Sequence, residues 1–233
     1  MIDAVEGILG PAMGLELYKF DVDLPDDVSL ALVICGELGA EEQRHTGFVV
    51  RNMMGETFLF HLATHNDFRK GKVSFNYNYL LIPFLEPAVE VPIVAFLFLL
   101  HHDTDGKISY STEYQDKDYF DDNGSLVMLK PSDGFTCATF VLETMRKYGM
   151  DLVDRATWPI NEADKDWQRG IIGLVGLSHE QFLAQIKNIG EYPRFRPEQA
   201  LGAAHYYEGK RLGYSIVQPA GLEVVTEMAR LRA

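Results

Sequence analysis

The sequence contains few cysteines and few basic residues for its length. Only Cys35 and Cys137 occur among 233 residues, too few for a disulfide framework or for a zinc site built from four thiolates. Lysine and arginine number 21 against 34 acidic residues, so the formal net charge is −13. The longest basic cluster is RKGK at residues 69–72. Because phosphate groups are bound by concentrated positive charge, we expect neither nucleic acid nor an anionic membrane as the main partner.

Long hydrophobic runs are also missing. The most apolar segment, Val91–Leu100, contains Pro92 and is too short to span a bilayer as a helix, so it predicts a buried strand. The first residues, Met1–Glu6, are acidic, whereas a signal peptide begins with a basic region. We therefore expect no transmembrane segment, no signal peptide and a cytoplasmic location, with export by a dedicated system left open.

A hydrophobic content of 47% is enough for a sizeable core. Residues 1–150 are rich in strand patterns, and residues 151–233 in helical ones. We therefore predict an α+β domain over 1–150 with a helical extension over 151–233 packed on it. The strands are expected at residues 28–35, 45–52, 56–62, 73–83, 89–100 and 126–129, and the C-terminal helices at 180–189, 197–209 and 222–232.

Two histidines lie in a predicted hairpin. If the loop is formed by residues 53–55, with Gly55 in the left-handed region, His61 falls opposite Gly47. His45 and His61 then point to the same face of the sheet, because side chains alternate with a period of two. A two-residue loop would place them on opposite faces.

Cys137 lies where a turn opens into an amphipathic helix. Loop-forming residues at 132–134 precede it, and residues 138–148 contain neither proline nor glycine. The unpaired N–H groups and positive dipole end of a helix favour a thiolate and could hold an oxyanion. These features indicate a nucleophile, and the alternative is a small buried thiol. Cys35 lies inside a predicted strand, so we assign it to the core.

The order of these residues resembles a known superfamily. HTGFVV at residues 45–50, then HLA at 61–63, then FTCATFV at 135–141 are similar to the circularly permuted branch of the NlpC/P60 papain-like proteins, which includes lecithin:retinol acyltransferase-like proteins. The resemblance covers about residues 28–150. It implies a papain-like antiparallel sheet packed on the nucleophile helix, with Cys137 as nucleophile, His45 as base and His61 as the residue that orients the base.

The resemblance implies a cysteine peptidase or amidase that forms a thioester acyl-enzyme and needs no cofactor or metal. Its substrate would be a peptide or amide, with peptidoglycan-derived and lipid substrates also represented among such proteins. The acyltransferase-like members carry an Asn-Cys-Glu-His-type motif where this chain has TCAT at 136–139, which favours hydrolysis over lipid acyl transfer. A catalytically silent domain that binds a peptide or a partner protein is the alternative from another class.

Other patterns are weaker candidates. His65 could replace His61 as the orienting residue if the register differs, and His45, His61 and His65 together could form a metal site. DTDGKI at residues 103–108 matches only the middle of an EF-hand loop, so a hairpin turn is the simpler interpretation. Trp158 and Trp167 could line a substrate groove or serve only in packing.

Overall fold

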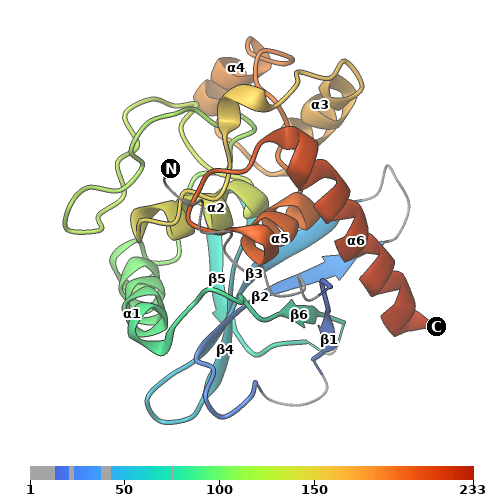
Figure 1. Cartoon of the computed structure of the whole chain (residues 1–233). Coiled ribbons are helices and arrows are strands. Elements are labelled where there is room, and N and C mark those ends of the chain that lie inside the picture. The colour runs from blue at the N-terminus through green and yellow to red at the C-terminus, as the bar shows by residue number, and fades with distance from the viewer. Residues whose placement is uncertain (1–13, 21–23, 38–42, 75) are drawn as a thin grey trace, which may run out of the picture.

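The computed structural model describes residues 14–20, 24–37, 43–74 and 76–233. It is an α+β protein in which the helices gather on one side of a six-stranded sheet (Figure 1). All strand pairs are antiparallel. The predictions made for the first six residues, and for Phe75 in the expected strand at 73–83, lie outside the described residues.

The strand order in the sheet is β1-β6-β2-β3-β4-β5. The strands are β1 (Tyr18–Lys19), β2 (Leu30–Gly36), β3 (Arg44–Arg51), β4 (Thr57–Thr64), β5 (Asp67–Gly71) and β6 (Asn78–Leu80). The strands predicted at 28–35, 45–52 and 56–62 are thus confirmed, while only three residues of the one at 73–83 are in a strand. At 126–129 a single bridge, Phe120 to Leu126, replaces the predicted strand.

The predicted register of the hairpin is confirmed. Asn52 N–H donates to the Glu56 carbonyl over 2.9 Å, and Gly55 has a φ of 79°. Strand alternation gives the sheet two apolar faces. One carries Phe48 and Phe60 within the main core, and the other carries Val49 and Leu59 within a smaller cluster. By the same alternation His45 and His61 belong to the face of Val49 and Leu59.

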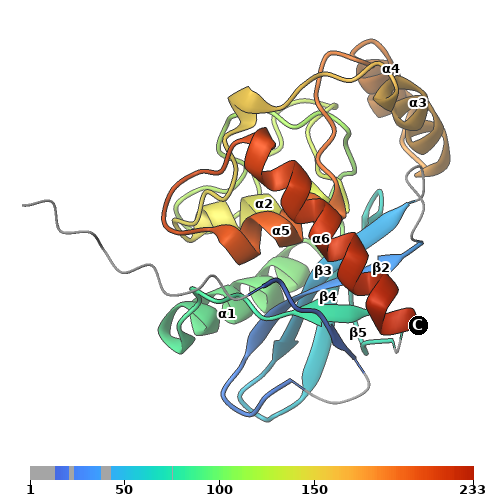
Figure 2. The ribbon, with the colours of Figure 1, turned by 45° about the vertical axis from the view of Figure 1, so that its right-hand side comes forward.

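The helices cover the face of the sheet that carries Phe48 and Phe60, where α5 and α6 cross over the sheet (Figure 2). Among the described residues, none of the helices is long and apolar enough to cross a membrane. The helices are α1 (Pro87–Asp103), α2 (Cys137–Lys147), the short 3-10 helix η1 (Arg155–Thr157), α3 (Asp164–Leu174), α4 (His179–Ile186), α5 (Pro197–Tyr206) and α6 (Tyr214–Arg232).

The prediction of a strand at residues 89–100 was wrong, because this segment forms most of α1. Its buried residues recur at helical spacing, as with Ile93, Leu97 and Leu100. The exposed face is also apolar: Val91 is 55% exposed and Leu99 is 59% exposed. Because both the buried and the exposed face of this helix are apolar, the sequence shows no helical periodicity and resembles that of a buried strand. The Asp105-Gly106 turn ends this helix and is not a hairpin.

One hydrophobic core joins the two predicted segments of the chain. It contains Phe140 of α2 and residues from the C-terminal helices, such as Leu201 of α5 and Val224 of α6. Helix α5 packs directly on α2, β2 and β3. The C-terminal third of the chain therefore shares its core with the sheet and packs against α2.

Candidate functional site

Helix α2 begins at Cys137 because the preceding residues cap it. The Thr136 hydroxyl accepts from the Thr139 N–H over 3.2 Å, and the Thr139 hydroxyl accepts from the Thr136 N–H over 2.8 Å. This reciprocal capping box fixes the first turn. The N–H groups of Cys137 and Ala138 are left for the thiol, and both are close enough to its sulfur to favour the thiolate.

The sulfur also meets strand β3. The backbone N–H of Thr46, the residue after His45, is directed at the Cys137 sulfur and favours its thiolate. The cysteine is nevertheless buried, with 9% of its surface exposed. Burial outweighs these donors and raises the pKa of Cys137 to about 11. The N–H groups at the helix end favour the thiolate as expected, but together with Thr46 they do not compensate for the lost hydration of a buried thiolate.

Strands β3 and β4 separate next to this sulfur. Their pairing runs from Arg51–Thr57 to Phe48–Phe60 and stops there, although β3 continues to Arg44 and β4 to Thr64. Gly47 permits the close approach at the end of the pairing, since a Cβ added there would lie 2.7 Å from the His61 Cβ.

The two predicted histidines bond to each other across this opening. His45 Nε2 lies 2.6 Å from His61 Nδ1, and the ring centroids are 4.8 Å apart. Burial and the neighbouring imidazole lower the pKa of His45 to about 3. Burial and then Arg69 lower the pKa of His61 to about 4. Both rings are therefore neutral at pH 7, and one of them donates the proton of the bond between them.

Cys137 and His45 line the same cavity, which has a volume of about 190 Å³. Its polar lining includes Thr136 and Arg194, and its aromatic lining includes Tyr110. Tyr110 is held beside the start of α2 because residues 109 and 111 hydrogen-bond to Phe135. Its hydroxyl interacts electrostatically with the Cys137 sulfur. Cys137, His45 and Tyr110 thus border one small cavity.

No family model matches this chain. Searches of curated proteins and of solved structures found no match either. The NlpC/P60 resemblance therefore remains a prediction, and the chemistry of the site rests on its own geometry.

The remaining predicted residues, His65 and Cys35, lie next to the site but outside the histidine pair. His65 accepts the Tyr110 N–H at its Nδ1 over 3.2 Å, which commits it to the loop and leaves His61 as the partner of His45. Cys35 pairs with His45 in the β2–β3 ladder, and burial raises its pKa. Within the described parts of the chain, no three His, Cys, Asp or Glu side chains converge as a metal ion requires.

In one wall of the cavity, sequence reasoning named only Trp167, as a residue that could line a groove or serve only in packing. Trp167 and Ile171 of α3, together with Arg194 and Phe195 of the α4–α5 loop, close the space in front of Cys137. These residues come from the segment predicted to be an extension, and no motif marks them. Trp158, the other tryptophan considered, stacks on Phe195 at 4.8 Å between ring centroids and supports this wall from behind.

Proposed function

We propose that this protein is a cysteine-dependent hydrolase of papain-like, permuted NlpC/P60 architecture that cleaves an amide or peptide bond. The observation that carries the proposal is the hydrogen bond between His45 and His61, together with the cavity that His45 shares with Cys137. A nucleophile, a base and a residue that orients the base are the parts that thiol catalysis needs. Cys137, His45 and His61 supply them in that order.

The histidine bond assigns the roles of the ring nitrogens. His45 uses Nε2 toward His61, so its Nδ1 is left for the proton of Cys137. When the Nε2 proton of His45 is donated to His61 Nδ1, His45 Nδ1 carries a lone pair and can act as the general base. His61 holds this tautomer and stabilises the imidazolium formed later, as the third member of a triad does.

The reaction runs through an acyl-enzyme. His45 removes the thiol proton as the sulfur attacks the carbonyl carbon, and the N–H groups of Cys137 and Ala138 bind the developing oxyanion. His45 then protonates the leaving amine, and the thioester forms. Water, deprotonated by His45, attacks the thioester and releases the acid and the free thiol. Because both groups are neutral at rest, proton transfer accompanies the attack instead of preceding it.

The size of the cavity favours a compact substrate group. Pockets for drug-sized ligands have volumes of about 300–1,000 Å³, whereas this cavity holds about 190 Å³. It suits one side chain or a short acyl group and has no room for a long lipid chain. The volume therefore supports amide or peptide hydrolysis over lipid acyl transfer.

Acylation by p-nitrophenyl acetate tests the proposal, read by p-nitrophenol release and by peptide mass spectrometry. We expect acetylation of Cys137 and a rate at least about 100-fold lower in His45→Gln, because a general base contributes roughly 10²–10⁴-fold. His61→Gln should slow the reaction less. Cys35→Ser is the matched control and should react as the wild type does.

The opposite outcome favours the second candidate, a catalytically silent domain that binds a peptide in the same cavity. The burial of Cys137 and the raised pKa of its thiol are what favour this candidate. It predicts no acylation of Cys137 in the folded protein, or an equal rate in wild type and His45→Gln.

A further inference from the structure

Arg194 is a buried positive charge with little compensation in the wall of the Cys137 cavity. Its side chain is 9% exposed, and its ion pair with Asp164 Oδ1 is 3.5 Å long. The same oxygen lies 2.6 Å from Arg196. A guanidinium has five N–H donors and keeps its charge in proteins. One long, shared ion pair leaves most of these donors without a partner among the described residues.

The carboxylates near this guanidinium are engaged by other arginines. Glu198 is engaged by Arg44 through two contacts of 2.8 Å, and Arg196 and Arg194 share Asp164. Asp164 lies closer to Arg196 than to Arg194. The Arg194 guanidinium can therefore take a further anionic partner.

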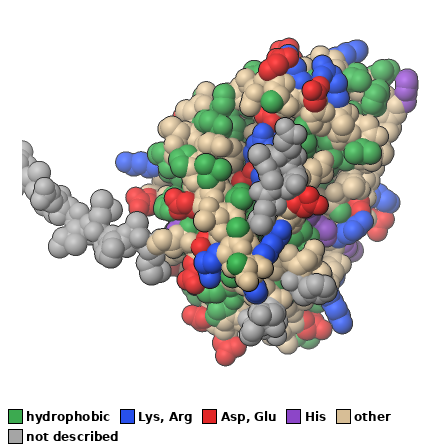
Figure 3. Space-filling view, turned by 90° about the vertical axis from the view of Figure 1, so that its right-hand side faces the viewer, with side chains coloured by type: hydrophobic (Ala, Val, Ile, Leu, Met, Phe, Trp, Pro, Cys, Tyr) green, Lys and Arg blue, Asp and Glu red, His purple; other side chains and the backbone are tan. Residues whose placement is uncertain are grey.

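One face of the molecule shows how charges are distributed on its surface. On the face drawn in Figure 3, acidic and basic side chains are intermingled, with no broad basic area. Because no broad basic area on this face would attract anions from a distance, a single cation can bind them only by direct contact. Arg194 is suited to this, because it lies in the cavity wall itself.

Arg194 is fixed in place and lies near the sulfur. Its guanidinium packs 3.8 Å from the ring centroid of Trp167, a stacking that holds the donor plane in one orientation. The Tyr110 hydroxyl interacts electrostatically with both the Cys137 sulfur and Arg194. The thiol and the guanidinium therefore border one phenol, and both residues line the same cavity.

We propose that Arg194 binds a carboxylate of the substrate next to Cys137, so that the enzyme acts on acidic peptides or amides. This inference rests on the proposed hydrolase function for the reaction, but the anion site itself does not. Arginine binds carboxylates through two parallel hydrogen bonds that are short and strong. The neutral resting thiol and imidazoles place no negative charge against such a ligand.

Two alkylating reagents of nearly equal size test the site without turnover. Iodoacetate carries a carboxylate and iodoacetamide does not, so the ratio of their rates at Cys137 reports the preference for an anion. We expect this ratio, measured at pH 9 by peptide mass spectrometry, to fall about tenfold or more in Arg194→Gln, as a lost charged hydrogen bond implies. Arg194→Lys should retain part of the preference.

Arg169→Gln is the matched control, because the ion pair of this exposed α3 arginine within the described part of the chain is with Asp166, at 2.7 Å. It should leave the ratio unchanged. An equal ratio in wild type and Arg194→Gln would overturn the proposal. If Arg194→Gln does not fold, the Lys variant and the protection experiment below decide the question.

Protection of Cys137 from iodoacetamide identifies the source of the carboxylate. N-acetylglutamate α-amide offers a side-chain carboxylate, N-acetylglutamine offers a terminal one, and the diamide N-acetylglutamine amide offers neither. Protection by one of the first two names the class of substrate, and protection by neither argues against the site. A carboxylate preference without ester turnover would refute the hydrolase and retain the anion site, and turnover without the preference would do the reverse.

Discussion

At the scale of single residues, the site is defined by groups held in neutral forms. One proton lies in the 2.6 Å bond between His45 and His61, and burial keeps either ring from taking up an additional proton. The Cys137 thiol is likewise held protonated by burial. The resting site therefore contains no thiolate–imidazolium ion pair. Such a pair would be expected if the cysteine lay at an exposed helix end. In the proposed mechanism, catalysis therefore relies on proton transfer between neutral groups.

The histidine pair predicts how stability depends on pH. An unfolded histidine has a pKa near 6.5, whereas His45 and His61 titrate at about 3 and about 4 in the folded protein. Between these values the unfolded chain binds more protons, so the free energy of unfolding decreases as pH falls below about 6.5. Urea unfolding from pH 7.5 to 4.5 should show this loss.

The double variant His45→Gln, His61→Gln should lose less stability than the wild type over the same interval. Replacement of the exposed His102 by Gln is the control and should leave the pH profile unchanged. Equal acid sensitivity in the double variant and the wild type would mean that other groups dominate.

At the scale of elements, the site depends on strands β3 and β4 approaching closely and then separating. Gly47 marks this point, because an added Cβ would meet both the Phe60 carbonyl and the His61 Cβ. The pairing of Phe48 with Phe60 fixes the strands on one side of it, and the histidine bond joins them on the other.

We therefore expect Gly47→Ala to displace β4 and to lengthen the bond between His45 and His61. Overpacking of this kind costs about 1–3 kcal/mol, which urea unfolding at pH 7.5 would measure. The rate of Cys137 acylation should fall as well. Gly170→Ala in α3 is the control, since a Cβ there meets nothing within 4 Å, and it should be neutral or slightly stabilising. A neutral Gly47→Ala would show that the strands can separate freely.

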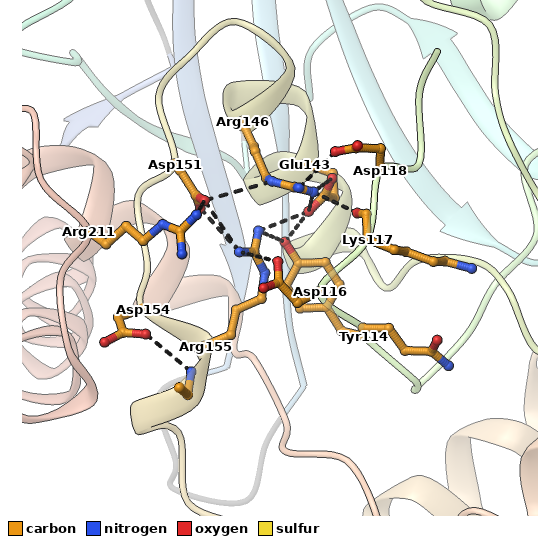
Figure 4. A network of polar contacts seen from close by, with 12 residues as sticks. Tyr114, Asp116, Lys117, Asp118, Glu143, Arg146, Asp151, Asp154, Arg155 and Arg211 are labelled. Atoms are coloured by element: carbon orange, nitrogen blue, oxygen red, sulfur yellow. Dashed lines mark hydrogen bonds and ion pairs between the residues drawn. The ribbon is translucent and has the colours of Figure 1, made fainter.

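At the scale of the whole molecule, a buried ionic network joins segments far apart in the chain (Figure 4). Glu143 of α2 accepts a hydrogen bond of 2.5 Å from the Tyr114 hydroxyl and one of 3.0 Å from Arg155. Its side chain is 3% exposed. The network fastens the loop after α1 and the start of η1 to the helix that carries Cys137.

Arg155→Leu should destabilise the protein by about 1.5–3 kcal/mol, because it removes one charged partner of the buried Glu143 carboxylate, which keeps Tyr114 and Arg146. Denaturant unfolding would measure this loss. Arg169→Leu, which removes an exposed ion pair, should change stability by less than about 1 kcal/mol. Similar values for the two variants would contradict the view that burial sets the cost.

The local parts of this protein could be predicted from its amino-acid sequence. The Gly55 turn fixed the register that places His45 and His61 on one face, and the run after Cys137 fixed the start of α2. Both follow from short-range rules of turn geometry and side-chain period. The helix at 87–103 escaped these rules because its exposed face is apolar, and period alone cannot separate such a helix from a buried strand.

Only the tertiary structure decided the environment of the site. The pKa of Cys137 rises because the α3 segment and the α4–α5 loop close over it, and no spacing in the sequence encodes that burial. Arg194 enters the cavity wall for the same reason, through contacts between residues distant in the chain. The hydrogen-bond register of a hairpin depends on a few neighbouring residues, so it can be predicted from the sequence. The burial of a side chain depends on every segment that covers it, so it cannot.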